Sequence, residues 1–439
     1  MAFLRIIFIS SILFFLVGTQ PASLAGINGD ANGDGFVDGL DYVVWLNHYN
    51  QSATGSGNGD FNNSGKVDGL DYVIWLNNYN QTVSTPTPIM PQPSQPVSTG
   101  KTKIAAGTYP DIAADSLGNA HIVYESGGKL IYRKFTLATN SLGPEEDTGI
   151  SQNASYRNDP SVAIDSQNRP HVIGGTGTGG GKYAFWNGSI WQQIGSFNRD
   201  TAIDLDKNDN VYVIQRGGTS GGYIGLFKKP AGATVFTPLS DPDTANGLPK
   251  GENDHVYGDI ALNLLDNSLH IVYRHGPGSA QFSYRGSANG TSWIGGGVSN
   301  DDTEAPSITV TSQGVTAAVS GNGTVFSKNS LTGSWTNLGR AITAGSRKLP
   351  SISADKSGDL FISCWGGKYN IKPSSGSFGS EKSMASLSGK PLGFMRVAGA
   401  ENFAYAVWEE GDNVHAENDN QYKNFDIVFA KITPTGNIQ

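Results

Sequence analysis

The stretch DPSVAIDSQNRPHVI, Asp159 to Ile173, decides the fold because versions of it return along the rest of the chain. Val162 and Ile164 alternate with small or polar residues, the next residues are turn formers, and an apolar run resumes at His171. This pattern predicts a strand, a polar turn and a second strand. Such a pair is half of an antiparallel four-stranded unit.

Seven related stretches follow one another at intervals of about 41 to 57 residues, and each precedes a further predicted strand pair. In the second copy that pair is joined by Asn187-Gly188, a dipeptide that favours a tight hairpin. Repeats of this length predict a mainly β protein, a seven-bladed β-propeller whose stacked blades bury one another. We expect Lys103 to Ala106 to complete the last blade. The copies begin at Pro110, Asp159, Thr201, Gly258, Pro306, Pro350 and Pro391.

The composition agrees with an exported, turn-rich protein. The chain has 439 residues, of which 58 are glycine and 10% are aromatic, and these values favour an all-β fold with many turns. An apolar run after Arg5, followed by Ser23-Leu24-Ala25, is typical of a signal peptide cleaved after Ala25. We therefore expect a secreted protein, extracellular or associated with the cell surface. No later apolar run has the ~20 residues of a membrane span.

The net charge of −8 is concentrated near the N-terminus. Residues 1–100 hold two basic and seven acidic side chains, whereas the remainder is nearly neutral. A nearly neutral propeller argues against nucleic acid as a partner. The acidic N-terminal part predicts a site for a hard cation.

Two segments, residues 28–50 and 58–80, are near copies that lie 30 residues apart. Oxygen-bearing side chains fall at loop positions 1, 3, 5, 9 and 12. The residue at position 7 offers its backbone carbonyl instead. This is the spacing of an EF-hand type Ca²⁺ loop with Asp at position 12. Ser64 replaces a carboxylate, so we expect the second site to be weaker. The predicted ligands are Asp30, Asn32, Asp34, Phe36, Asp38 and Asp41, then Asp60, Asn62, Ser64, Lys66, Asp68 and Asp71.

One short helix is predicted after each loop, Leu40 to Tyr49 and Leu70 to Tyr79, and no helix precedes the first loop. Two such loops, each with a single exiting helix, resemble the dockerin family over residues 28–80. The resemblance implies a module that folds on Ca²⁺ and docks into cohesin modules of extracellular assemblies. Loop positions 10 and 11 are Gly-Leu in both copies, unlike the small hydroxylated pair of many family members. A Ca²⁺-stabilised module without a docking partner is therefore the alternative.

These features predict four parts of the chain. The signal peptide covers residues 1–25 and the dockerin-like domain covers 26–82. Residues 83–100 are rich in Pro, Ser and Thr, which predicts an extended spacer. The propeller covers residues 101–439.

In a propeller, the loop that enters the innermost strand and the loop that leaves the second strand lie on one face, which usually binds ligand. Here these loops carry Arg, carboxylates, His and Trp, a mixture that suits a glycan. A His and a Tyr near an Arg can abstract the C5 proton of a uronate while the Arg neutralises its carboxylate. The candidate catalytic residues, all in the fourth blade, are His255, Tyr257, Arg274 and His275, and the candidate ligand-binding residues are Arg216, Trp365, Trp408 and Glu409.

Three functions stay open, because fold alone does not assign one. The dockerin resemblance implies a polysaccharide-related role, within an extracellular polysaccharide-degrading assembly. A propeller that binds polysaccharide or glycans is favoured, because no paired-carboxylate, nucleophile or metal motif stands out in it. The alternative is a polysaccharide lyase or glycoside hydrolase, since the propeller looks like sialidase-like and polysaccharide-lyase propellers at the level of fold. The third is a protein-binding scaffold. His121, His171 and His270 occupy one repeat position, which predicts packing and not a catalytic or metal triad.

Overall fold

The computed structural model describes residues 28–32, 37–79, 95–96, 100–152, 159–176, 180–198, 201–216, 224–242, 258–275, 281–299, 305–343, 349–412 and 425–439. Two units are present, Met1–Pro91 and Gln92–Gln439, and each is treated separately below. The boundary between them falls within the predicted spacer. None of the described helices is long and apolar enough to cross a membrane.

The first unit contains two equivalent helices, α1 (Gly39–His48) and α2 (Gly69–Asn78), and a 3₁₀ turn, η1 (Ser56–Asn58). Helix α1 begins where the predicted Ca²⁺ loop ends. The Asp38 carboxylate caps the helix by accepting from the Leu40 amide, and the Asp41 carboxylate accepts from the Asp38 amide at 2.7 Å. This reciprocal capping box satisfies amides that a helix otherwise leaves free. The same arrangement starts α2.

A shared aromatic core holds the two helices together. The indole of Trp45 donates to the Asp68 carbonyl at 3.0 Å, and the indole of Trp75 donates to the Asp38 carbonyl at 2.9 Å. Each helix is therefore tied to the loop of the other repeat. A hydrogen bond of this kind contributes about 1 kcal/mol.

The described strands of the second unit form seven sheets, which confirms the predicted seven-bladed propeller. Blade 1 holds β3 (Thr108–Ala114), β4 (Ala120–Ser126), β5 (Lys129–Thr136), β6 (Ser141–Leu142) and β7 (Glu146–Ser151), with β1 (Gln95–Pro96) paired to β6. Blade 2 holds β8 (Ser161–Ile164), β9 (Pro170–Thr176), β10 (Gly180–Trp186) and β11 (Trp191–Phe197), and blade 3 holds β12 (Ala202–Leu205), β13 (Val211–Arg216), β14 (Ile224–Lys229) and β15 (Thr237–Pro238).

The remaining blades follow the same antiparallel order. Blade 4 holds β16 (Gly258–Leu262), β17 (Leu269–His275), β18 (Gln281–Ser287) and β19 (Gly297–Ser299), and blade 5 holds β20 (Ser307–Val310), β21 (Thr316–Val319), β22 (Thr324–Lys328) and β23 (Thr336–Arg340). Blade 6 holds β24 (Ser351–Ala354), β25 (Leu360–Cys364), β26 (Lys368–Lys372) and β27 (Lys382–Ser383), with the 3₁₀ turn η3 (Trp365–Gly367) after β25. Blade 7 holds β28 (Leu392–Gly399), β29 (Ala404–Gly411), β30 (Phe425–Ile432) and β2 (Thr102–Ala106).

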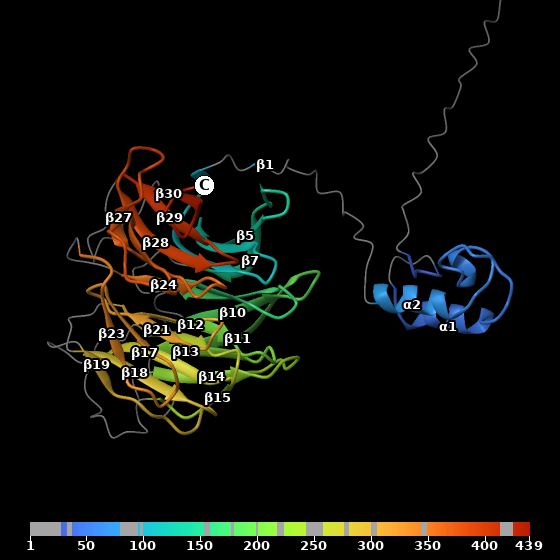
Figure 1. The fold of residues 1–439 in the computed structure, drawn as a ribbon, viewed down its shortest axis with the longest axis horizontal. Coiled ribbons are helices and arrows are strands. Elements are labelled where there is room, and N and C mark those ends of the chain that lie inside the picture. Colours follow the sequence, from blue (N-terminus) through green and yellow to red (C-terminus); the bar gives the residue numbers. More distant parts are fainter. Residues whose placement is uncertain are drawn as a thin grey trace, which may run out of the picture. The chain divides into compact units, whose positions relative to one another are not determined.

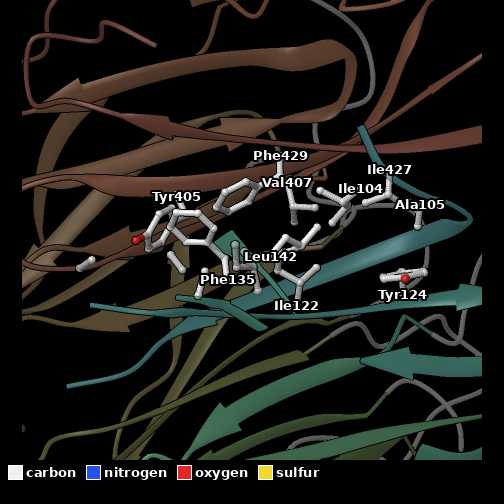
Figure 2. Close-up of a cluster of buried hydrophobic side chains, with 14 of the residues drawn as sticks. Ile104, Ala105, Ile122, Tyr124, Phe135, Leu142, Tyr405, Val407, Ile427 and Phe429 are labelled. Carbon is white, nitrogen blue, oxygen red and sulfur yellow. The ribbon is translucent and has the colours of Figure 1, made fainter. Parts of the chain in front are cut away.

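Strand β2 closes the ring. It comes from the start of the propeller and pairs antiparallel with β30 near the C-terminus, as the sequence predicts for Lys103 to Ala106. The C-terminal strands consequently lie beside those of the first blade (Figure 1). Side chains from both ends of the chain meet in one buried cluster, where Ile104 of β2 packs with Ile122 of β4 and Phe429 of β30 (Figure 2).

One local prediction differs from the structure. The hairpin between β10 and β11 has four loop residues, because Trp186 pairs with Trp191. The Asn187 side chain accepts hydrogen bonds from the Ser189 and Ile190 amides, each at 3.0 Å. This side-chain turn replaces the two-residue turn that Asn-Gly favours.

Side chains of the inner strands link each of blades 1 to 6 to the blade that follows it. The Asp111 carboxylate of blade 1 accepts from the Val162 amide of blade 2 at 2.9 Å, and the Asp259 carboxylate of blade 4 accepts from the Ile308 amide of blade 5 at 3.0 Å. Ser161, Ser307 and Ser351, at the same repeat position, accept from Ile203, Ile352 and Val397. In blade 3 this position is Ala202, and Asp204, two residues later, makes the link to Leu262 at 2.7 Å.

The three repeat-equivalent histidines are buried within their own blades. His121 contacts Asp115 at 3.1 Å and the Tyr132 hydroxyl at 2.8 Å, and His171 is held in the same way. His270 lies between the hydroxyls of Ser268 and Tyr284. These contacts confirm the packing role. Cys364 is also buried.

We predict that these histidines stay neutral well below the pH at which free histidine protonates. Burial lowers the pKa of His270 to about 4 and lowers the pKa of His121 and His171. Unfolding then takes up protons as the pH falls from 6.5 towards 4, so these groups make the fold less stable over that window. Histidine NMR titration, assigned with a His270→Gln variant, measures the pKa values. A His270 pKa near 6.5 would contradict the buried network.

Candidate site at the mouth of the axial cavity

The predicted fourth-blade site is only partly within the described residues. His255 and Tyr257 lie outside them, and the side chain of His275 does too. Arg274 lies near the end of β17, half-buried, and its Nε is enclosed with no hydrogen-bond partner. Arg274 does not line the axial cavity described below.

Trp408 and Glu409, two of the predicted ligand-binding residues, are fully buried. This corrects the expectation that both face a ligand. The Trp408 indole donates to Glu410 at 2.9 Å, and Glu410 also accepts from the backbone and side chain of Ser388. Trp408 therefore has a structural role in the interior of the propeller. Arg216 ends β13, and its side chain lies outside the described residues.

The inner strands of all seven blades surround an axial cavity of about 790 Å³. The repeat determines which side chains line this cavity, because the inward positions of the inner strands carry the side chains that link the blades. Carboxylates therefore line the cavity together with one arginine at the equivalent position of blade 7. The arginine is Arg396, and the carboxylates include Asp111, Asp159, Asp204 and Asp259. Other charged residues of the lining are Asp115, Asp165, Asp206, Asp209, Asp355, Lys207 and Lys356.

Enclosure in the cavity wall penalises the charged form of the four carboxyl groups named first. It raises the pKa of Asp111 and Asp159 to about 6, although the nearby Arg396 counteracts part of this effect. The Asp159 side chain is 37% exposed, so solvent also limits the effect of enclosure on that group. It raises the pKa of Asp204 to about 7 and also raises that of Asp259. The cavity therefore changes its charge between mildly acidic and neutral pH.

Arg396 is the exception among the residues at its repeat position. A guanidinium has no acceptor, so it cannot make the link that Asp111 or Ser351 makes. Instead its Nη2 donates to Asp159 at 3.0 Å and its Nη1 approaches the Leu349 carbonyl at 3.4 Å. The Arg396 side chain is 18% exposed. The sequence analysis missed Arg396 because its seventh copy begins at Pro391, which places Leu392 at this position. The structure shows Arg396 to be the equivalent residue, since Val397 donates to Ser351 as Ile352 does to Ser307.

An apolar group that we call the mouth cluster contacts Arg396 and lies just outside the residues that line the cavity. It contains Tyr109, Leu349 and Phe394, with Trp365 packed against it. The Trp365 and Phe394 rings meet at right angles with 4.9 Å between centroids, and the Arg396 guanidinium lies 5.7 Å from the Phe394 ring. Trp365, one of the predicted ligand-binding residues, is the partly exposed member of this cluster.

The backbone at the mouth cluster is strained. Tyr109 has φ of 50° and Leu349 has φ of 26°, in a region that residues with a Cβ seldom adopt. The Glu409 carboxylate fixes the geometry by accepting from the Tyr109 amide at 2.5 Å and the Phe394 amide at 3.3 Å. Such strain tends to persist at ligand sites.

The first unit offers a separate site, and its residues fit a cation. Asp41, Asp60 and Asp71 are completely buried, and among the described residues none of them pairs with a basic side chain. Buried carboxylates need a compensating positive charge. Among the described residues, no three His, Cys, Asp or Glu side chains lie close enough together to hold a metal ion by themselves. In the second loop, Asn62, Ser64 and the Lys66 carbonyl would therefore have to supply the remaining ligands.

The first loop is only partly described. Asp34 and Phe36 lie outside the described residues. The Asp41 carboxylate accepts from the Ala31 amide at 2.8 Å, as that of Asp71 does from the Phe61 amide at 2.9 Å. Asp30, Asn32, Asp38 and Asp68 occupy the remaining predicted positions. The two loops thus share the same frame.

The propeller is similar to solved structures with different activities. They include a fungal alcohol oxidase of the AA5 family in complex with copper (13% identity, 76% of this chain and 76% of that chain, TM-score 0.49). An ulvan lyase of polysaccharide lyase family PL25 matches at 10% identity over 78% and 96%, with a TM-score of 0.50. A streptogramin B lyase matches at 12% identity over 78% and 98%, with a TM-score of 0.49. At such identities only the fold is shared.

No curated protein sequence matches this chain. Residues 28–80 match the family model of the dockerin type I domain, a family whose members bind Ca²⁺ and cohesins. The chain therefore joins a dockerin type I domain, at residues 28–80, to a seven-bladed β-propeller.

Proposed function

We propose that this is a secreted protein that binds polysaccharide or glycans at the mouth of the axial cavity and docks into a cohesin through its dockerin domain. The observation that carries the propeller's role is that Phe394 contacts both the Trp365 ring and the Arg396 guanidinium, which pairs with Asp159. Ligand sites commonly combine apolar ring surfaces with a few fixed polar groups. A sugar ring offers both an apolar face and hydroxyl groups to such a site.

The dockerin domain supports a tethered role. Leu40, Val43, Leu46 and Tyr49 of the first repeat are between 44% and 62% exposed, and their counterparts on α2 are exposed to nearly the same degree. Apolar side chains gathered on an exposed helix are typical of a protein interface. This favours docking over the alternative of a Ca²⁺-stabilised module without a partner.

The raised pKa of Asp159 supports an enzymatic activity as a second candidate function. A carboxyl group with a pKa of about 6 suits general acid or base catalysis near neutral pH. Glycoside hydrolysis and uronate elimination both need such a group. New reducing ends released from a polysaccharide, and lost in an Asp159→Asn variant, would favour catalysis over binding alone. A protein-binding scaffold would show neither activity nor glycan binding.

We predict that Trp365→Ala weakens glycan binding by about tenfold or more, which corresponds to at least 1.4 kcal/mol lost with a buried aromatic contact. Isothermal titration of the mature chain with the polysaccharide that co-sediments best measures the effect. Trp186→Ala is the matched control, because Trp186 is equally half-buried and packs against Trp191 at the end of β10. Equal losses in both variants, or none in Trp365→Ala, would argue against the mouth as the binding site.

We predict that the mature chain binds two Ca²⁺ ions, the second more weakly, and that helical circular dichroism rises on binding. Asp60→Ala should remove one of the two binding events in isothermal titration, because Asp60 is a buried carboxylate of the second loop. Asp412→Ala, which alters an exposed propeller carboxylate paired with Lys390, should leave both events unchanged. Absence of any binding heat in the parent chain would contradict the metal assignment.

A further inference from the structure

We propose that Arg396 recognises the carboxylate of a uronic acid residue in the bound glycan, and that Asp159 occupies Arg396 until the ligand displaces it. This inference rests on the proposed glycan-binding function and adds the class of ligand. It assigns specificity to two residues that lie on blades 7 and 2. Neither belongs to the fourth-blade set suggested by the sequence.

The first argument is that Arg396 does not make the link to the next blade that is typical of its repeat position. Its equivalents Asp111, Ser161, Asp259, Ser307 and Ser351 each accept from the backbone of the next blade. Arg396 makes no such link, so an acceptor at this position would serve the fold better. A basic residue retained against the pattern of the repeat points to a role in binding.

The second argument concerns the donors of the guanidinium. Arginine has five N–H donors arranged for two parallel hydrogen bonds to one carboxylate. Arg396 makes one hydrogen bond of ordinary length, to Asp159, and one long contact, to the Leu349 carbonyl. It is partly exposed and lines the cavity. A ligand carboxylate can therefore replace Asp159 without breaking a network of other bonds.

The third argument is that aromatic rings lie next to the Arg396 guanidinium. The guanidinium lies over the Phe394 ring, and Phe394 in turn contacts Trp365. A uronate presents a flat apolar ring face next to a carboxylate. The mouth offers a matching surface for each of these two parts.

The surrounding charges make the recognition depend on pH. Arg396 of β28 attracts the Asp159 carboxylate, whereas Glu409 of β29 repels it, and Arg396 also interacts with Asp111 of β3 and Asp259 of β16. At pH 8 an ionised Asp159 holds Arg396 and repels a uronate. At pH 5 to 5.5 Asp159, with a pKa of about 6, is mostly protonated, while a uronate remains charged. Binding should therefore tighten as the pH falls.

The test is isothermal titration of the mature chain with galacturonate, mannuronate–guluronate and glucuronate-containing oligosaccharides, each paired with its carboxyl-reduced counterpart. At pH 5.5 we expect at least a tenfold preference for one uronate oligosaccharide over its reduced form. If only protonated Asp159 permits binding, affinity should fall by up to about 100-fold between pH 5 and pH 8. The reduced counterpart should show a much smaller change.

Three variants assign the effect. Arg396→Gln should lower the affinity for the uronate to about that for the reduced form and so abolish the preference, and Arg396→Lys should retain part of the preference because one charge but no bidentate donor remains. Asp159→Asn should raise uronate affinity at pH 8 and flatten the pH profile. Thermal melts confirm that each variant is folded.

The outcomes separate this inference from the proposed function. Equal binding of uronate and reduced oligosaccharides, sensitive to Trp365→Ala, would overturn the inference and leave the glycan-binding function standing. A uronate preference that survives Arg396→Gln would also overturn it. Binding of no oligosaccharide to the parent chain would overturn both.

Discussion

Closure of the ring is the constraint on which the propeller depends. A four-stranded sheet cannot bury both of its faces alone, so each blade needs a neighbour on either side. The first and last blades find each other because β2 pairs with β30, and the aromatic cluster around Phe429 and Tyr405 then packs against blade 1. Hydrogen bonds from Asp and Ser side chains continue this linkage from blade to blade. The axial cavity is a consequence of that closure.

The linking position departs from the pattern of the repeat in two blades. Ala202 loses the linking side chain, but Asp204 restores the link one step along the same face of the strand. Arg396 loses it without replacement and turns to Asp159. Glu409, at the same mouth, holds the strained Tyr109 amide. We therefore regard the departure from the repeat, more than any motif, as the signal of the site.

Local patterns allowed much of the fold to be predicted. The strand–turn–strand copies specify the blades, and the spacing of Asp30 to Asp41 specifies a Ca²⁺ loop, because each pattern lies within a few turns of chain. The site depends on residues that are far apart in sequence: Asp159 and Arg396 are 237 positions apart and meet only after the ring closes. Trp408 was expected at the surface, but Glu410 holds its indole inside. Sequence position alone does not reveal such side-chain direction.

The most direct test of the account is a crystal structure of the mature chain soaked with the tightest-binding oligosaccharide. The account predicts sugar density at the mouth of the axial cavity, with a ring against Trp365 and polar groups within hydrogen-bond distance of Arg396. Density confined to the fourth blade around Arg274, or on the outer edges of the blades, would contradict the assignment of the mouth as the binding site.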